Sequence, residues 1–374
     1  MARWFQAVID NSLLLVAGAA AALIWANVDA TSYTYASHAL HFGVNDIAMV
    51  FFFALATKEV VEAMLPGGPL SSPREAGLPI FAAVGGMAAP ALIFLAGARV
   101  LHQEGLTSGW AIPCATDIAF SYLAARLIFP KSSPAIPFLL LLAIADDALG
   151  LLVLAIFYPS APLEFGYLAL GLIPAILLAW AMRRYRIRNF WWYLVVPGVF
   201  SWAGLYAGGI HPALALVPII PFMPAARKDL GIFASREARR HDTLSRFEHA
   251  WRVPVQCILF FFGLANAGVP LTSIGTPTWL VLGGLILGKP LGVVGMTLLA
   301  EQIGFRRAKA LDLRSLIVLG VAAGIGFTVA LFFATAAFRP GVVLDQAKMG
   351  ALLSVLAAPL AILLARALRI RRNA

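Results

Sequence analysis

Four ionisable residues are notable because each lies near the centre of a long apolar segment. Asp117 lies in one segment, Asp146 and Asp147 are adjacent in the next, and Lys289 lies in a later one. A charge inside a membrane costs several kcal/mol and usually marks an ion or proton pathway. Three acids against one base leave negative charge that must hold protons or a cation in such surroundings. These residues predict a site for H⁺ and a metal cation at Asp146 and Asp147.

The carboxylates of Asp146 and Asp147 can point in two different directions. Neighbouring residues on a helix point about 100° apart, so one carboxylate can face a cavity while the other faces a neighbouring helix. A purely structural alternative is that buried ion pairs hold helices together, with Lys289 balancing one aspartate. That alternative leaves the other two acids unbalanced, so we favour the cation site.

Two of the apolar segments contain residues that interrupt helices. Pro113 precedes the polar step Thr116-Asp117, and a proline removes the hydrogen bond that would continue the helix. A later segment contains Gly320, Gly324 and Gly326, a glycine density that favours unwinding. The sequence therefore predicts two interrupted helices.

The composition identifies the elements that must position these residues. Hydrophobic residues make up 61% of the chain and charged residues 12%, and the mean hydropathy is +0.86. A soluble domain averages about 25% charged residues. Apolar runs of about 20 residues, long enough to cross a bilayer, recur along the whole chain. Because strand-type alternation is absent, we expect an all-α membrane protein.

Hydropathy and the positions of Gly, Pro and charged residues predict about twelve transmembrane helices. Eleven is the alternative, because prolines and glycines interrupt the region 190–224. The predicted spans are 12–29, 45–65, 77–98, 109–128, 134–158, 162–182, 190–205, 207–224, 254–272, 278–302, 314–338 and 346–368.

The basic residues predict the orientation, since Lys and Arg in short loops collect on the cytoplasmic side. With a cytoplasmic N-terminus, only Arg99, Arg339 and Lys348 fall outside, and Lys58 and Lys289 lie within spans. Most of the 28 Lys and Arg residues are then cytoplasmic, as are both termini. The net charge of +10 therefore reflects membrane topology, and we expect no nucleic-acid partner.

The two interrupted helices occupy corresponding places in two three-helix units, 77–158 and 279–368. These units enter the membrane from opposite sides, so we expect inverted repeats whose broken helices cross at mid-membrane, an arrangement typical of secondary transporters. We expect residues 1–374 to form a single transporter domain, with a cytoplasmic loop at 225–253.

Several motifs carry a family resemblance over nearly the whole chain. Taken together and in their order along the chain, these motifs resemble those of the NhaA family of bacterial sodium/proton antiporters. The motifs are Asn45-Asp46, Ala82-Ala83-Val84-Gly85-Gly86-Met87, Ala115-Thr116-Asp117-Ile118-Ala119-Phe120, Ala143-Ile144-Ala145-Asp146-Asp147, Gly209-Ile210-His211-Pro212, Phe247-Glu248-His249, Leu264-Ala265-Asn266-Ala267-Gly268-Val269, Gly288-Lys289-Pro290-Leu291-Gly292 and Gly324-Ile325-Gly326-Phe327-Thr328.

The resemblance implies a role for each candidate residue. Asp147 and Asp146 are the carriers of Na⁺ and H⁺, Thr116 and Asp117 line the crossing of the broken helices, and Lys289 faces Asp146. It implies electrogenic exchange of cytoplasmic Na⁺, and also Li⁺, for external H⁺ across the bacterial inner membrane. Such exchange serves sodium and pH homeostasis. We expect membrane lipid as surroundings, no enzymatic activity and no cofactor.

The chain also departs from the family pattern. The charged cluster that regulates the family by pH corresponds here to Lys58, Glu62 and Glu248, with Lys58 aligned with an acid and Val61 with an arginine. We therefore expect regulation at this cluster to differ. The resemblance implies a homodimer, but the loop 30–44 is shorter than the hairpin-bearing loop that makes the family's dimer contact.

Two other functions remain as alternatives. A sodium-coupled anion or organic-acid symporter shares broken-helix architecture, but it needs a cationic or hydroxyl-rich substrate site, for which the sequence offers only Lys289. An intramembrane aspartyl protease also uses two aspartates within spans. Its acids lie on separate helices, however, and the adjacent Asp146-Asp147 does not fit.

Overall fold

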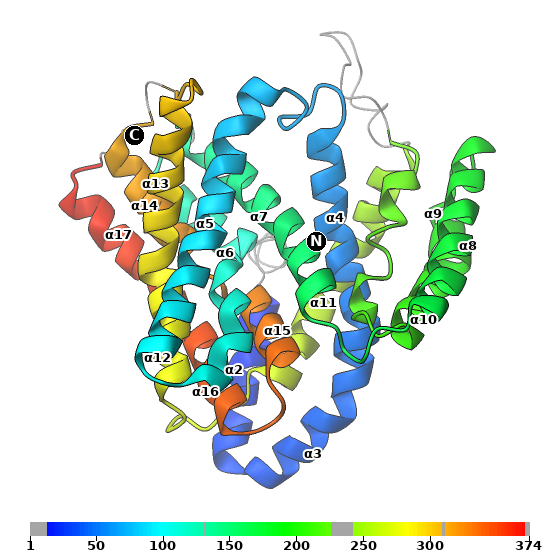
Figure 1. Ribbon diagram of the computed structural model, residues 1–374, viewed down its shortest axis with the longest axis horizontal. Coiled ribbons are helices and arrows are strands. Elements are labelled where there is room, and N and C mark those ends of the chain that lie inside the picture. The colour runs from blue at the N-terminus through cyan, green and yellow to red at the C-terminus, as the bar shows by residue number, and fades with distance from the viewer. Residues whose placement is uncertain (1–12, 131, 226–241, 309–310, 371–374) are drawn as a thin grey trace, which may run out of the picture.

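The computed structural model describes residues 13–130, 132–225, 242–308 and 311–370, and these residues form helices joined by short loops, with no strand among them (Figure 1). The helices of the first half are α2 (Leu13–Val28), α3 (Ala30–His41), η1 (Phe42–Ala48), α4 (Met49–Met64), α5 (Pro73–Val100), η2 (Glu104–Cys114), α6 (Ile118–Ile128), α7 (Ala135–Phe157) and α8 (Phe165–Arg184).

The second half continues the pattern with shorter pieces. Its helices are α9 (Phe190–Tyr193), η3 (Leu194–Gly198), α10 (Val199–Ala207), η4 (Pro212–Leu214), η5 (Ile220–Phe222), α11 (Thr243–Asn266), α12 (Thr276–Gly283), η7 (Gly284–Gly288), α13 (Lys289–Gln302), α14 (Leu313–Ala323), α15 (Phe327–Ala337), α16 (Val342–Leu353), η8 (Ser354–Leu356) and α17 (Ala357–Ala367).

Many of these helices are long and apolar enough to cross a bilayer. Six described helices of 20 to 35 residues qualify individually. Two further pairs, η2 with α6 and α14 with α15, qualify when each bent pair counts as one span. Their helices bend by 54° and 50° at breaks of a few residues. The chain is therefore a multi-pass membrane protein with two interrupted helices, as the sequence predicts.

Helix α8 illustrates how the outer surface meets lipid. Its buried face consists of Leu168 and the small residues Gly171, Ala175 and Ala179. Its exposed face carries large apolar side chains, Leu170, Ile173, Leu177 and Trp180. In water this pattern would be inverted, because exposed positions of a soluble helix are mostly polar. Small residues at the inner face allow helix backbones to approach closely.

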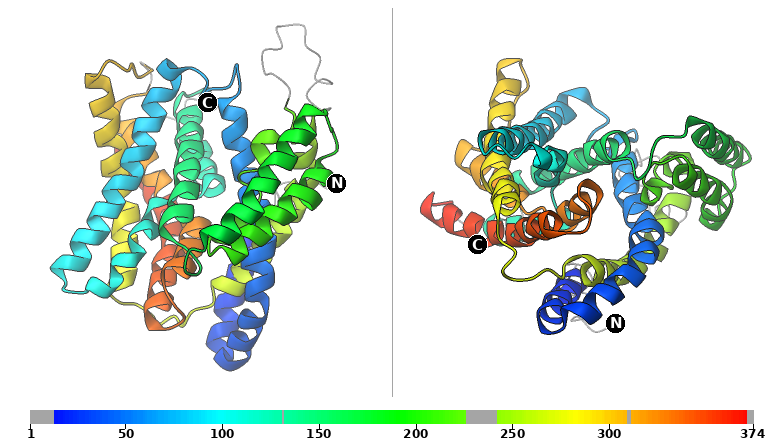
Figure 2. Two further views of the ribbon diagram at one scale, coloured as in Figure 1. Left: turned by 45° about the vertical axis from the view of Figure 1, so that its right-hand side comes forward. Right: turned by 60° about the horizontal axis from the view of Figure 1, so that its bottom comes forward.

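Two groups of helices pack internally through small residues. Helix α5 lies along α13, and α2 lies along α11 on the other side of the molecule (Figure 2). A Cβ atom added to Gly292 of α13 would lie 1.9 Å from the carbonyl oxygen of Gly85 in α5. A Cβ atom added to Gly18 of α2 would lie 2.1 Å from that of Phe260 in α11. Backbone therefore meets backbone within each group.

The contact of α5 with α13 makes a stability prediction. We expect Gly292→Ala to lower the melting temperature of the detergent-solubilised protein by several degrees. The added methyl group overlaps with backbone, which cannot rotate away, and overpacking typically costs about 1–3 kcal/mol. Gly295→Ala is the matched control, because it lies on the same helix with nothing within 4 Å of an added Cβ atom. Equal melting temperatures for the two variants would contradict the proposed close contact.

The predicted span 207–224 is wrong as a continuous helix. The structure has only the short turns η4 and η5 in this segment, after Gly209, whose φ of +82° ends the preceding helix. Prolines 212, 218 and 221 remove backbone donors that a helix would need. The segment is nevertheless buried, and irregular backbone at membrane depth is tolerated where protein surrounds it.

Two predicted loops are also partly helical. Helix α3 occupies most of the predicted loop 30–44 and runs through η1 into α4. Helix α11 begins at Thr243, so the last part of the predicted cytoplasmic loop 225–253 is helical, while residues 226–241 lie outside the described part. Lys348, predicted in an outer loop, is a buried residue of α16. Polar helix ends look like loops in a hydropathy profile.

Candidate functional site

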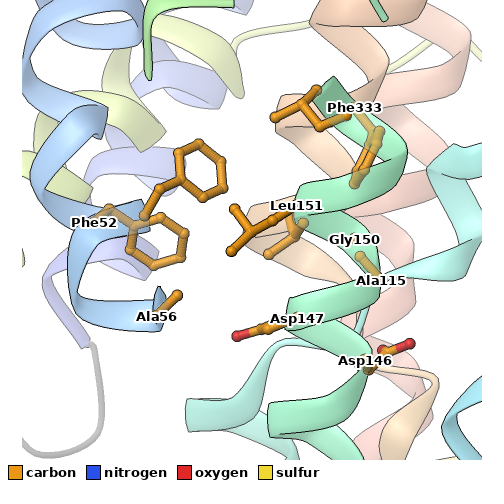
Figure 3. A pocket seen from close by; sticks show the side chains of 11 residues that line it. Phe52, Ala56, Ala115, Asp146, Asp147, Gly150, Leu151 and Phe333 are labelled. Carbon is orange, nitrogen blue, oxygen red and sulfur yellow. The ribbon is translucent and has the colours of Figure 1, made fainter. Parts of the chain in front are cut away.

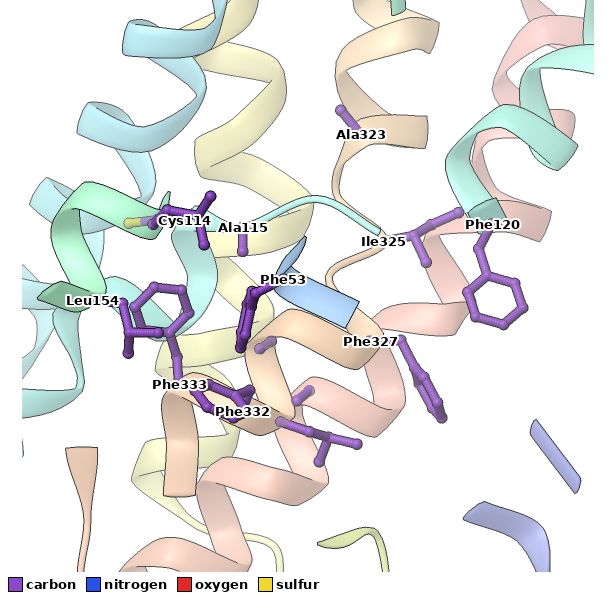
Figure 4. Close-up of a cluster of buried hydrophobic side chains, with 14 of the residues drawn as sticks. Phe53, Cys114, Ala115, Phe120, Leu154, Ala323, Ile325, Phe327, Phe332 and Phe333 are labelled. Atoms are coloured by element: carbon purple, nitrogen blue, oxygen red, sulfur yellow. The ribbon is translucent and has the colours of Figure 1, made fainter. Parts of the chain in front are cut away.

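The two interrupted helices meet at their breaks. In the first, residues 115–117 are extended between η2 and α6, and in the second, residues 324–326 separate α14 from α15. The amide of Asp117 donates a hydrogen bond to the carbonyl oxygen of Ile325 at 2.7 Å. Figure 4 shows the two links near Ala115 and Ile325, within a packed cluster of phenylalanines. The predicted interruptions thus form a single crossing.

Asp117 joins the two half-helices that begin at this crossing. Its Oδ1 accepts from the amide of Phe120 at 3.4 Å, in the first turn of α6. Its Oδ2 accepts from the amide of Thr328 at 3.2 Å and from the Thr328 hydroxyl, in the first turn of α15. Helix N-termini carry partial positive charge and favour an anion. The carboxylate of Asp117 is therefore stabilised by two helix ends.

Thr328 is a site residue that the sequence analysis did not select. Its signal is positional: it follows the glycines of the second break and is the second residue of α15. A hydroxyl at this position can donate a hydrogen bond to a carboxylate that belongs to another helix.

Lys289 forms the central ion pair of the site. Its Nζ atom lies 2.6 Å from Oδ2 of Asp146, and both side chains are only 1% exposed. Lys289 also donates to the Thr116 hydroxyl at the first break. The second oxygen of Asp146, Oδ1, is buried and accepts no hydrogen bond from the described residues. One oxygen of the pair is therefore left for another ligand.

Asp147 has different surroundings, as the 100° step along the helix requires. Figure 3 shows its carboxylate pointing toward α4, near Ala56, while Asp146 points away from α4. Among the described residues Asp147 makes no ion pair and accepts no hydrogen bond. Asp147 is therefore the uncompensated acid of the site.

A cavity of about 290 Å³ leads to Asp147 and Asp117 from one side. Its wall includes Glu59 of α4, Tyr122 of α6 and Gln256 of α11. On the opposite side of Asp147 the space is only about 20 Å³, hardly more than one water needs. Of these two spaces, which described residues line, the larger one is therefore the wider approach to Asp147.

Packed apolar side chains close the other side. The small space is bounded by Phe53, Leu154 and Phe333, of which Phe333 is labelled in Figure 3. The rings of Phe53 and Phe332 meet edge to face with their centroids 4.9 Å apart, and the same cluster appears in Figure 4. This apolar packing separates Asp147 from the opposite end of the molecule.

The predicted regulatory residues also come together, near the end of α4 that contains Glu59. Lys58 is buried, lies 3.0 Å from Glu62 one turn along α4, and forms an ion pair with Glu248 of α11. The cluster thus links α4 to α11, two helices whose side chains line the cavity. In the described residues no group of three or more His, Cys, Asp or Glu side chains could hold a resident metal ion.

Comparisons with known proteins identify the family of this chain. The family model described as Na⁺/H⁺ antiporter 1 matches residues 2–365. The chain is 44% identical to Na(+)/H(+) antiporter NhaA 2 of Pelobacter propionicus, over 97% of each chain. It is 46% identical to Na(+)/H(+) antiporter NhaA of Geotalea uraniireducens, over 97% of this chain and 96% of that one.

A solved structure shares the fold. The sodium proton antiporter MjNhaP1 from Methanocaldococcus jannaschii superimposes with a TM-score of 0.57 over 95% of this chain and 91% of that chain, at 16% sequence identity.

The family model and the two NhaA relatives match nearly the whole length of this chain, and the relatives do so at 44% and 46% identity. This chain belongs to the Na⁺/H⁺ antiporter 1 family.

Proposed function

We propose that this chain exchanges Na⁺ for H⁺ across a membrane, the activity that the names of its relatives state for those proteins. Asp147 carries the proposal. It is an uncompensated carboxylate at the end of a cavity, one residue from the Asp146–Lys289 pair. A carboxylate in such surroundings must hold either a proton or a cation. When both compete for the same oxygen atoms, the binding of one releases the other.

The neighbouring residues then take distinct roles. Asp147 binds Na⁺ first, and Asp146 contributes its open oxygen, Oδ1. As the cation arrives, Lys289 loses its partner and releases a proton. One Na⁺ therefore displaces one proton from Asp147 and one from Lys289. Two H⁺ moving in for one Na⁺ moving out transfer one net positive charge, so exchange is electrogenic.

Thr116 and Asp117 hold the crossing rather than the cation. The hydroxyl of Thr116 accepts from Lys289, and both oxygens of Asp117 accept from the first turns of α6 and α15. In this role Asp117 offsets the positive ends of two helices. Its negative charge therefore does not add to the cation site.

We infer that the open cavity corresponds to an inward-facing state. We propose that 77–158 and 279–368 form inverted repeats within a single transporter domain of twelve spans, 1–374. Movement of the two repeats together against α4 and α11 would close the cavity and open the apolar seal near Phe333. The cation would then reach the other side without a continuous channel.

We place the protein in the bacterial inner membrane with both termini in the cytoplasm. This orientation puts the start of α5, which contains Arg74, and the segment after α13, which contains Arg306 and Arg307, on the cytoplasmic side. The cavity then opens to the cytoplasm, so Na⁺ leaves the cell as H⁺ enters. We propose Li⁺ as a second substrate and a homodimer as the assembly, surrounded by lipid.

A sodium-coupled symporter of anions is the other reading of the architecture. It would need a cationic group that is open to an anion. In the described part of the site Lys289 is the one basic side chain, and it is engaged by Asp146 and Thr116. The large cavity instead contains Glu59 and Asp147, which would repel an anion. These contacts favour exchange of cations.

Everted membrane vesicles test the proposal. Vesicles are prepared from bacteria that lack their own sodium/proton antiporters and express this chain, and respiration first acidifies their interior. Addition of NaCl should then raise the internal pH, because Na⁺ enters as H⁺ leaves. A pH gradient that does not respond to Na⁺ or Li⁺, with the chain present in the membrane, would exclude the proposed activity.

The charged cluster makes a regulatory prediction. We expect Glu62→Gln to move the midpoint of the pH profile by less than about half a unit, because Lys58 keeps its ion pair with Glu248 and so keeps a counter-charge. Lys58→Met, which leaves both acids unbalanced, should change the profile more. The pH dependence of exchange in vesicles measures both. A strong displacement by Glu62→Gln would instead identify Glu62 as a pH sensor.

A further inference from the structure

One side chain of the large cavity has no place in the site described above. The cavity wall contains seven oxygen-bearing side chains among the described residues. Thr116, Asp117 and Thr328 already bond to Lys289 or to one another. Asp147 and Glu59 are acids. The other two are Tyr122 and Gln256. Gln256 alone among the seven has an amide carbonyl oxygen in its side chain.

Gln256 lies at the depth of the cation site. It is thirteen residues into α11, and Asp147 is twelve residues into α7. At about 1.5 Å per residue, the two positions are about 20 Å and 18 Å from the starts of their helices. Both helices start at the same end of the molecule, the top in Figure 1. Gln256 therefore faces the cavity at the level of Asp147 rather than at its mouth.

Gln256 adds a neutral amide oxygen to the oxygen atoms of this cavity wall. Next to Gln256 the wall is apolar, with Val255 and Leu259 on the same helix and Leu55 on α4. Hard cations take oxygen ligands, and amide carbonyl oxygens serve alongside carboxylates and water. A Na⁺ ion that loses water in this cavity would find carboxylate oxygen on one wall and amide oxygen on the other.

The two walls belong to different groups of helices. Asp147 is on α7, which packs against α5, whereas α11 packs against α2. A Cβ atom on Gly263 of α11 would lie 2.8 Å from a backbone oxygen of α2, so that contact is close. If the groups move relative to each other during transport, an oxygen on α11 serves the cation only while the cavity is open.

We propose that Gln256 contacts the incoming cation through its amide oxygen in the inward-facing state and so sets the affinity for cytoplasmic Na⁺. The proposal rests on the exchange activity proposed above. Gln256 acts with Asp147 during the loss of water, and the contact is broken when the cavity closes. The affinity on the outer side is therefore independent of Gln256.

Kinetics measured from each side test this proposal. The protein is reconstituted into proteoliposomes. Molecules inserted in one of the two orientations are blocked, so that transport is measured from one side of the protein at a time. We expect Gln256→Leu to raise the apparent KM for Na⁺ on the cytoplasmic side about tenfold, the equivalent of about 1.4 kcal/mol. The outer KM and kcat should stay within about twofold of the parent. Gln256→Asn, which retains the amide on a shorter side chain, should give an intermediate KM.

The controls separate this role from a structural one. Cys257→Ala alters the next residue, which is exposed away from the core, and should leave both KM values unchanged. If Gln256→Leu does not fold, Gln256→Asn still decides the question. Unchanged KM values, or equal increases on both sides, would overturn the proposal. A parent protein that moves no H⁺ in response to Na⁺ would instead refute the exchange activity itself.

Discussion

Replacement of Asp147 by asparagine is expected to abolish exchange while the protein stays folded. Asparagine has nearly the same shape as aspartate but cannot bind a proton or carry the negative charge that attracts Na⁺. Since Asp147 makes no ion pair or hydrogen bond among the described residues, its loss leaves no partner unsatisfied. Uptake of radioactive Na⁺ driven by a pH gradient in proteoliposomes should fall to the level of empty liposomes.

Thermal stability gives an independent measurement of the same variant. A ligand that binds only the folded state raises its stability with concentration. The melting temperature of the parent should therefore rise with added Na⁺, and that of Asp147→Asn should not. Asp345→Asn, an equivalent change in α16 outside the site, is the control and should behave as the parent. Parental transport by Asp147→Asn would exclude Asp147 as the carrier.

Replacement of Lys289 by alanine is expected to have the largest effect on stability. The change leaves Asp146 buried without its counter-charge and removes the donor to Thr116. Breaking one side of a buried ion pair costs about 3–5 kcal/mol, so the melting temperature should fall by many degrees. Transport should persist under alkaline conditions, because a cation cannot bind another cation and Lys289 is not itself a Na⁺ ligand.

The charge moved per transport cycle shows whether Lys289 is only the counter-charge of Asp146 or also carries a proton. If Lys289 carries one of two protons, Lys289→Ala should exchange one H⁺ for one Na⁺, and exchange should no longer generate a membrane potential. Exchange should also require a higher pH, because a buried carboxylate without its counter-charge is more readily protonated. Parental stability, pH profile and charge movement together would contradict the pairing with Asp146.

The chemistry of the site was predictable because charge is rare in apolar segments. Asp117, Asp146, Asp147 and Lys289 were selected for their cost in a membrane, and the structure brings all four to one crossing. Family resemblance supplied the partner of Lys289, since three acids were available and spacing alone does not choose among them.

The contacts that depend on three dimensions were not predictable. Thr328 donates a hydrogen bond to Asp117, which lies 211 residues earlier in the sequence. Gln256 looks like an ordinary polar residue of α11 until the cavity is known. Neither residue carries a charge that hydropathy would single out.

The errors in the fold have a common cause. Hydropathy measures composition, whereas a helix also needs backbone donors, and the prolines of 207–224 remove them. Conversely, the polar residues of α3 and of the first turns of α11 lower the hydropathy but still form helix. The apolar pattern therefore located most spans and misjudged those whose ends or backbone are unusual.

Proton movement in response to a Na⁺ gradient tests the central claim most directly. Purified protein is reconstituted into liposomes that contain a pH-sensitive dye, and Na⁺ is added outside with the membrane potential held at zero. The account predicts that the lumen becomes more alkaline as Na⁺ enters, at a rate that Asp147→Asn abolishes. No pH change, or acidification of the lumen as Na⁺ enters, would contradict it.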